Sequence, residues 1–171
     1  MKKIVILLVL TLSANILFAQ ASRGKEVPVL KEISGLQVIK TIYPEATGVE
    51  KINEVWFRIV DASKKPIGFA LSSKPFTDSI KGYHNTTPVI VVLDKDKVIR
   101  KVGILSHWET TSYISRLDRQ TFFNSWNGLT VESALKKKAG VDSYTGATIS
   151  ANSLTKNVEL VLKKANENKV K

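Results

Sequence analysis

An α+β fold, in which an antiparallel sheet of hairpins packs against helices, is the class that this sequence predicts. Short β-branched and aromatic runs recur at hairpin spacing between residues 54 and 106, and helical patterns follow them to the C-terminus. The 171 residues are 43% hydrophobic and 24% charged, a composition typical of one compact domain. We therefore expect a single domain over residues 22–171, preceded by a targeting segment.

Residues 1–21 have the pattern of a secretory signal peptide. Two lysines precede an apolar run of 15 residues, and Ala19 and Ala21 are the small residues that a cleavage site needs. An uncleaved membrane anchor is the alternative, although the run is shorter than the roughly 20 residues of a membrane-spanning helix. We expect export, with the domain in the periplasm or at the outer face of the cytoplasmic membrane.

The residue counts exclude several classes of site. The sequence has no cysteine, which excludes disulfides, thiol-linked lipid, thiolate metal sites and cysteine-held iron–sulfur clusters. Without residues 1–21, 24 basic and 15 acidic residues remain, a formal charge of +9 that favours anionic membrane surfaces or acidic partners. No stretch alternates aromatic and basic residues as a base-stacking surface does, so nucleic acid is not an expected partner.

The first elements are predicted from residue periodicity. Residues 31–44 have a mixed period that fits a helix or a strand, and this alternative stays open. Residues 54–60 and 67–73 form one expected hairpin, and 88–93 and 98–105 form a second. Every residue from Val89 to Leu93 is apolar, which predicts a strand covered on both faces.

Three helices are expected to cover the sheet. Residues 115–128 place Leu117, Phe122 and Trp126 at near-helical spacing before Gly128. A shorter helix is expected from Thr130 to Gly140, with these two residues as its caps. The last helix begins near residue 150. Its apolar stripe consists of Leu154, Val158, Val161, Leu162 and Ala165.

The stretch DSYTGATIS, residues 142–150, lies directly before this last helix. In the ordinary interpretation, Thr148 or Ser150 is the N-cap and Asp142 forms a turn. The unpaired amides of a helix start also favour an anion, and Gly146 would let the backbone approach one closely. A hydrolase with a serine or threonine nucleophile is a weaker alternative, because no G-x-S-x-G frame surrounds these hydroxyls.

The segment Asp142 to Thr148 resembles the flavinylation motif of the FMN-binding domain family, an upstream Asp followed by Ser/Thr-Gly-Ala-Thr. This family includes the covalent-flavin subunits of sodium-translocating NADH:quinone reductase and of Rnf complexes. The resemblance extends to His107, Glu109 and Thr110 in HWET and to the stretch FFNSWNGLTV. These matches follow the family's order over roughly residues 66–165.

The resemblance implies that a separate flavin transferase, with FAD as donor, joins FMN through its phosphate to Thr148. It also implies a cofactor-binding role for further residues: Asp142, Tyr144, Thr145, Gly146, Ala147, His107, Glu109 and Thr110. The implied protein is a redox carrier or an oxidoreductase component rather than a stand-alone enzyme. Its implied partners are redox proteins or a membrane electron-transport complex. No metal is expected, because His107 and Glu109, placed together on one strand, lack a third ligand nearby.

The sequence departs from the family at two places. Thr111, Ser112 and Tyr113 stand where Pro-Gly and a further Gly are usual, and Gly82-Tyr83-His84-Asn85 replaces Gly-Tyr-x-Gly. Both departures concern the flavin ring's environment, so we expect a potential different from that of the ion-pumping subunits. Two alternatives remain: a domain that binds or senses FMN reversibly, and a periplasmic binding module without flavin.

Overall fold

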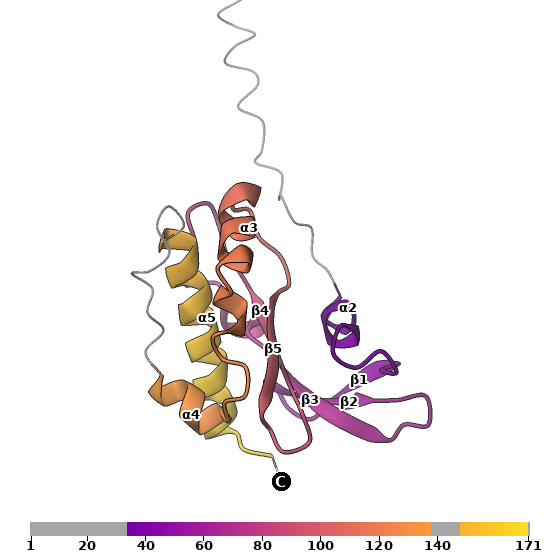
Figure 1. Cartoon of the computed structure of the whole chain (residues 1–171). Coiled ribbons are helices and arrows are strands. Elements are labelled where there is room, and N and C mark those ends of the chain that lie inside the picture. Colours follow the sequence, from indigo (N-terminus) through magenta and orange to yellow (C-terminus); the bar gives the residue numbers. More distant parts are fainter. Residues whose placement is uncertain (1–33, 138–147, 171) are drawn as a thin grey trace, which may run out of the picture.

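A computed structural model describes residues 34–137 and 148–170 (Figure 1). Its sheet is antiparallel throughout, with its five strands in sequence order. The strands are β1 (Gly48–Lys51), β2 (Trp56–Val60), β3 (Pro66–Ser72), β4 (Val89–Leu93) and β5 (Ile99–Ile104). Both predicted hairpins, β2–β3 and β4–β5, are confirmed, and so is the α+β class.

An aspartate side chain organises the turn of each hairpin. Asp61 Oδ1 accepts hydrogen bonds from the backbone N–H groups of Ser63 and Lys65, at 2.8 and 2.9 Å. Asp94 Oδ1 accepts two equivalent bonds in the β4–β5 turn, both at 2.9 Å. The lysine two residues before the second strand has a positive φ in each turn: 60° at Lys64 and 62° at Lys97. The two turns therefore use the same local chemistry.

Helix α2 (Gly35–Lys40) covers one face of the sheet. The side chain of Ser34 caps it by accepting a hydrogen bond from the N–H of Leu36. Its Val38 and Ile39 pack in a small cluster with side chains of the sheet and of the residues around it: Ala46, Ile59, Ala70, Ile90, Val92 and Leu105. The open alternative for residues 31–44 is thus resolved as a helix over its central part.

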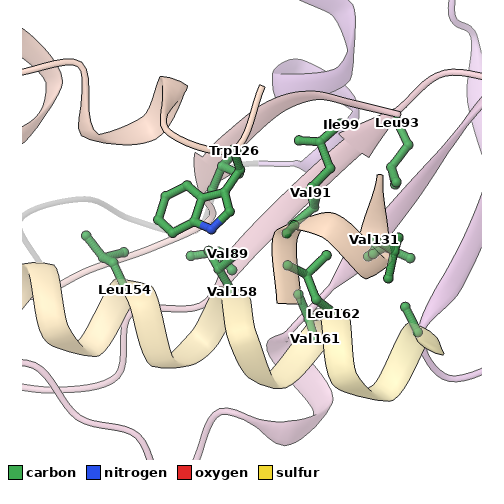
Figure 2. Packing of buried hydrophobic residues seen from close by; sticks show 14 of the residues in the cluster. Val89, Val91, Leu93, Ile99, Trp126, Val131, Leu154, Val158, Val161 and Leu162 are labelled. Carbon is green, nitrogen blue, oxygen red and sulfur yellow. The ribbon is translucent and has the colours of Figure 1, made fainter. Parts of the chain in front are cut away.

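A larger cluster fills the opposite face, beneath the C-terminal helix α5 (Thr148–Glu167). Figure 2 shows Leu154, Val158, Val161 and Leu162 of α5 facing the β4–β5 side of the sheet, with Trp126 beside them. All five predicted stripe residues are completely buried. Every residue of β4 is buried as well, which confirms that helices cover both faces of this strand.

The helix predicted over residues 115–128 is wrong in its extent. Helix α3 begins earlier, at Thr111, and ends at Arg119. Thr121 then has a left-handed backbone, with φ of 58°, and a short 3₁₀ helix, η2 (Phe122–Asn124), follows. Phe122 is still buried against Trp126, with ring centroids 5.2 Å apart. The backbone therefore turns at Thr121, and Phe122 and Trp126 are buried without belonging to one continuous helix. Their near-helical spacing in the sequence did not predict this turn.

Helix α4 (Val131–Lys136) confirms Thr130 as an N-cap, whose side chain accepts from the N–H of Ser133. The helix ends at Lys136 because Lys137 has an extended backbone, and the predicted cap Gly140 lies outside the described residues. Strand β1 was not predicted, since it is short and mostly exposed. Among the described helices, none combines the length and apolar character that crossing a membrane requires.

Candidate functional site

A completely buried carboxylate lies in the segment between β5 and α3. Glu109 is 0% exposed, and its oxygens accept hydrogen bonds from two chain segments. The backbone N–H groups of Tyr83 and His84 donate to Oε2 and Oε1, both at 3.1 Å. The hydroxyl of Ser150, in the first turn of α5, donates to Oε2. Glu109 thus joins the turn at residues 82–85 to the start of the last helix.

Gly82 makes this arrangement possible. A Cβ atom at this position would lie 2.5 Å from Glu109 Oε1 and 2.8 Å from its carboxyl carbon, so any other residue would have to displace the buried carboxylate. The turn is closed by the N–H of Gly82, which donates to the carbonyl of Asn85 at 2.8 Å. Close approach of the carboxylate therefore explains the glycine.

His107 is also buried, at 4% exposed, but its ring nitrogens are less fully hydrogen-bonded than the carboxylate of Glu109. Its Nδ1 has no hydrogen-bond partner among the described residues. Burial lowers the pKa of His107, while the backbone and charge of Glu109 oppose this shift. Since β5 ends at Ile104, His107 and Glu109 lie in the following loop and not on the strand where the sequence pattern placed them.

A cavity of about 520 Å³ lies beside His107, along the outer edge of β5. Helix α2 borders it on one side, and α3 and the residues around η2 border it on the other. Its lining is mixed, since Arg100, Lys101 and Asp118 accompany apolar side chains such as Phe123. Its volume falls in the range of small-molecule pockets.

Thr148 is the first residue of α5 and is exposed. Ser150, two residues later, is only 2% exposed because it contacts Glu109. Ser150 lies inside the helix, so it is not the N-cap that the ordinary interpretation allowed. Thr110 is exposed at the cap position of α3, where its side chain makes no capping hydrogen bond.

The structure brings part of the predicted site together. His107, Glu109 and Thr110 lie in one loop, and the Glu109–Ser150 bond holds this loop next to the α5 turn that contains Thr148. The remaining predicted site residues are Asp142, Tyr144, Thr145, Gly146 and Ala147, which lie outside the described residues. Their cofactor roles, like those of His107, Glu109 and Thr110, stay predictions.

Sequence reasoning missed the structural roles of Gly82 and Ser150. The only signal was the glycine that begins the 82–85 turn, at one of the two departures from the family pattern. Large apolar or aromatic side chains are also exposed in this region: Tyr83 at 65%, Ile149 at 53% and Tyr113 at 40%. Over the described ranges 34–137 and 148–170, no group of three or more acidic or histidine side chains could hold a metal ion.

Comparison with known proteins gives this geometry a family context. Residues 82–163 match the model of the FMN-binding domain, a range that begins at the glycine beneath Glu109. The G subunit of the ion-translocating oxidoreductase complex of Aliivibrio fischeri (strain MJ11) is 33% identical over 87 residues, which are 46% of this chain and 41% of that protein. The corresponding protein of Shewanella piezotolerans (strain WP3 / JCM 13877) is 32% identical over 99 residues, 53% of this chain and 47% of that protein. The aligned stretches span less than half of either relative, and the resemblance to the FMN-binding domain family is confirmed.

Proposed function

From the FMN-binding domain that residues 82–163 match, we propose that this protein carries FMN covalently on Thr148 and passes electrons between partner proteins. One observation supports this choice of residue above the others. Thr148 is exposed, yet it stands two residues from Ser150, whose side chain is held by a buried carboxylate within the matched range. Thr148 is therefore a solvent-exposed residue in a helical turn that the Ser150–Glu109 hydrogen bond anchors.

The chemistry of the described residues fits a phosphate-linked flavin. A phosphodiester on Thr148 would carry one negative charge at the N-terminus of a 20-residue helix, where the helix dipole stabilises an anion by about 0.3 to 1 kcal/mol. In the loop that Glu109 joins to this turn, the buried His107 Nδ1 has a hydrogen-bonding capacity that the described protein atoms do not use. The site thus offers both an anchoring point and polar capacity for a ligand.

Attachment is proposed as a transfer from FAD catalysed by a separate flavin transferase. The Thr148 oxygen forms a bond to the phosphorus of the FMN half, and the phosphoanhydride bond breaks. AMP leaves, the hydroxyl proton is released, and no electron moves. The product is heavier by one FMN less one water.

Three exposed side chains are candidates to hold the flavin ring. Tyr83, Tyr113 and Ile149 come from the turn, from α3 and from α5, the segments that meet around Glu109. Aromatic and aliphatic surfaces suit a flat aromatic ring. When bound, FMN supplies the electron transfer itself, and the protein's residues anchor the ring and limit its orientation.

The partners are proposed from the relatives' names and from the leader-like N-terminus. Both relatives belong to an ion-translocating oxidoreductase complex, so a membrane electron-transport complex or a redox protein is the proposed partner. Residues 1–21 are proposed to export the domain to the periplasm or the outer face of the cytoplasmic membrane, where the flavin transferase would modify it.

The direct test is co-expression with a flavin transferase, followed by intact-mass and absorbance measurement. The wild-type protein is expected to be yellow and to gain one FMN less one water, whereas Thr148→Ala should gain nothing. Thr148→Ser should retain labelling, because it keeps a hydroxyl. Thr47→Ala is the control and should be labelled as wild type is, since Thr47 is an exposed threonine outside the matched range 82–163.

The alternatives give different results in the same experiment. Colour that is lost on denaturation without a mass change would establish reversible FMN binding instead of attachment. A colourless, unmodified wild-type protein would contradict the covalent proposal. Labelling that persists in Thr148→Ala would move the acceptor to another residue.

A further inference from the structure

We propose that Glu109 is a positioning residue for flavin attachment, which fixes the first turn of α5 and so presents the Thr148 hydroxyl to the flavin transferase. This inference rests on the proposed function. Three contacts carry it: two backbone N–H groups from the 82–85 turn and one hydroxyl from α5 all end on this single carboxylate. Glu109 needs no contact with the flavin to act in this way.

The complete burial of the Glu109 carboxylate needs a physical explanation. Transferring an ionised group from water into a protein is costly unless hydrogen bonds compensate, and three donors provide that compensation here. An apolar side chain could fill the same volume without this cost. We therefore attribute the presence of Glu109 at this buried position to its hydrogen bonds, which join the 82–85 turn to the first turn of α5.

The geometry of α5 connects Glu109 to Thr148. Successive residues of an α-helix are rotated by about 100°, so two residues correspond to about 200°. Ser150 points inward to Glu109, which places Thr148 nearly on the opposite side of the helix, towards solvent. Fixing the rotation of the helix at Ser150 therefore fixes the side of α5 from which the Thr148 side chain projects.

Further hydrogen bonds continue the same seam along α5. Ser153 and Asn157, three and seven residues after Ser150, are buried on the same face. The Ser153 hydroxyl lies 2.6 Å from the hydroxyl of Thr87, and the hydroxyl of Thr77 donates to Asn157 Oδ1 at 2.6 Å. Glu109 holds the end of this seam at the first helical turn. In any α-helix the first turn has no intrahelical acceptors for its N–H groups, which makes it prone to fraying.

The test compares the initial rate of FMN transfer to variants of the full chain at equal concentration. Glu109→Gln and Ser150→Ala should slow transfer by about 10- to 100-fold, the effect of misplacing a reacting group by about 1 Å. Glu159→Gln, the same substitution at an exposed position of α5, should stay within about twofold of wild type. Val161→Ala lowers stability from the far half of the same helix and controls for a general loss of stability.

Thermal unfolding separates positioning from stability. If Glu109→Gln slows transfer no more than Val161→Ala does at an equal loss of Tm, the proposal is overturned. Slow transfer in Glu109→Gln together with fast transfer in an equally destabilised Val161→Ala supports it. The Gly82→Ala variant, which pushes a Cβ into the carboxylate, should behave as Glu109→Gln does, whereas Gly48→Ala meets no atom within 4 Å and should behave as wild type.

Amide hydrogen exchange on the unmodified protein keeps the inference independent of flavin attachment. In Glu109→Gln, the Tyr83 and His84 amides and the first turn of α5 should lose protection, while β4 keeps it. If the wild-type protein accepts no FMN, the proposed function fails, and this exchange measurement alone decides whether Glu109 fixes the helix start. Unchanged protection in Glu109→Gln would overturn the inference.

Discussion

His107 and Glu109 are two residues apart and both buried, yet their polar atoms differ in how fully they are hydrogen-bonded. Glu109 receives three hydrogen bonds from two other segments, whereas Nδ1 of His107 has no partner within the described part of the chain. A buried and unsatisfied nitrogen usually costs stability, and it commonly marks a place where a ligand or water completes the site. The pair therefore separates a structural role, at Glu109, from a candidate ligand contact, at His107.

The burial of His107 predicts a pH-dependent stability. Its pKa is lowered in the folded protein by burial, whereas the unfolded imidazole titrates near its usual value of about 6.5. As the pH falls below about 6.5, the unfolded chain binds the proton first, so the free energy of unfolding decreases. This loss continues until the pH passes the folded pKa and then levels off.

Urea unfolding at about pH 7.5, 6.5 and 5.5 measures this dependence. The variant His107→Gln should lose part of the decrease, since it removes the titrating group. His84→Gln is the control, because His84 is exposed and bonds to Glu109 through its backbone N–H, which the variant keeps. Identical pH profiles for wild type and His107→Gln would contradict the prediction.

At the scale of elements, α5 is held by two kinds of interaction. Its first half contributes the polar seam of Ser150, Ser153 and Asn157, and its second half contributes apolar side chains such as Val161 and Leu162. Apolar contacts tolerate small shifts of a helix, whereas hydrogen bonds specify one rotation and one register. The end of α5 that carries Thr148 is thus the more precisely specified half.

Asn157→Ala tests the polar seam directly. Asn157 is completely buried and accepts from the Thr77 hydroxyl, so its removal leaves that hydroxyl without this acceptor. We expect a loss of about 1 to 3 kcal/mol in the free energy of unfolding. Asn152→Ala, at an exposed position of the same helix, should change it by no more than about 0.5 kcal/mol. Equal effects of the two substitutions in urea unfolding would show that the seam contributes nothing.

At the scale of the whole molecule, the sheet separates two clusters of unequal size. The larger cluster lies under α5 and the smaller one under α2, and β4 contributes side chains to both because it is covered on each face. Within the larger cluster, Trp56 Nε1 donates to the carbonyl of Ala165 near the end of α5 at 3.1 Å, which ties β2 to that helix. Shared strands should make the two clusters unfold together.

The chain without residues 1–21 is therefore expected to unfold in a single transition. Far-UV circular dichroism and tryptophan fluorescence should give the same midpoint, as two-state unfolding requires. Ile39→Ala, in the smaller cluster, should lower both midpoints equally, although every tryptophan is remote in sequence from that helix. A fluorescence midpoint that does not move would indicate that the two faces unfold separately, and failure of the shortened chain to fold would contradict the predicted domain boundary.

The sequence by itself determined the features whose signal is local. The two hairpins, the doubly covered β4, the apolar stripe of α5 and the Thr130 cap all follow from the spacing of side chains within one segment. The motif order also revealed the resemblance to the FMN-binding domain family, because short motifs keep their order along the chain. Thr148 was chosen in this way, and its attachment role stays a prediction.

Only the tertiary structure decided the features that depend on contacts between distant segments. Glu109 meets Tyr83 across 26 residues and Ser150 across 41, and no periodicity relates positions so far apart. The end of α3 and the left-handed Thr121 likewise follow from burying Phe122 and Trp126 against the sheet, which overrides their helical spacing. Because glutamate side chains are mostly exposed in folded proteins, the sequence alone gives no reason to expect a buried Glu109. The burial of Glu109 against Gly82 follows only from the fold, which brings the 82–85 turn and the start of α5 to the same place.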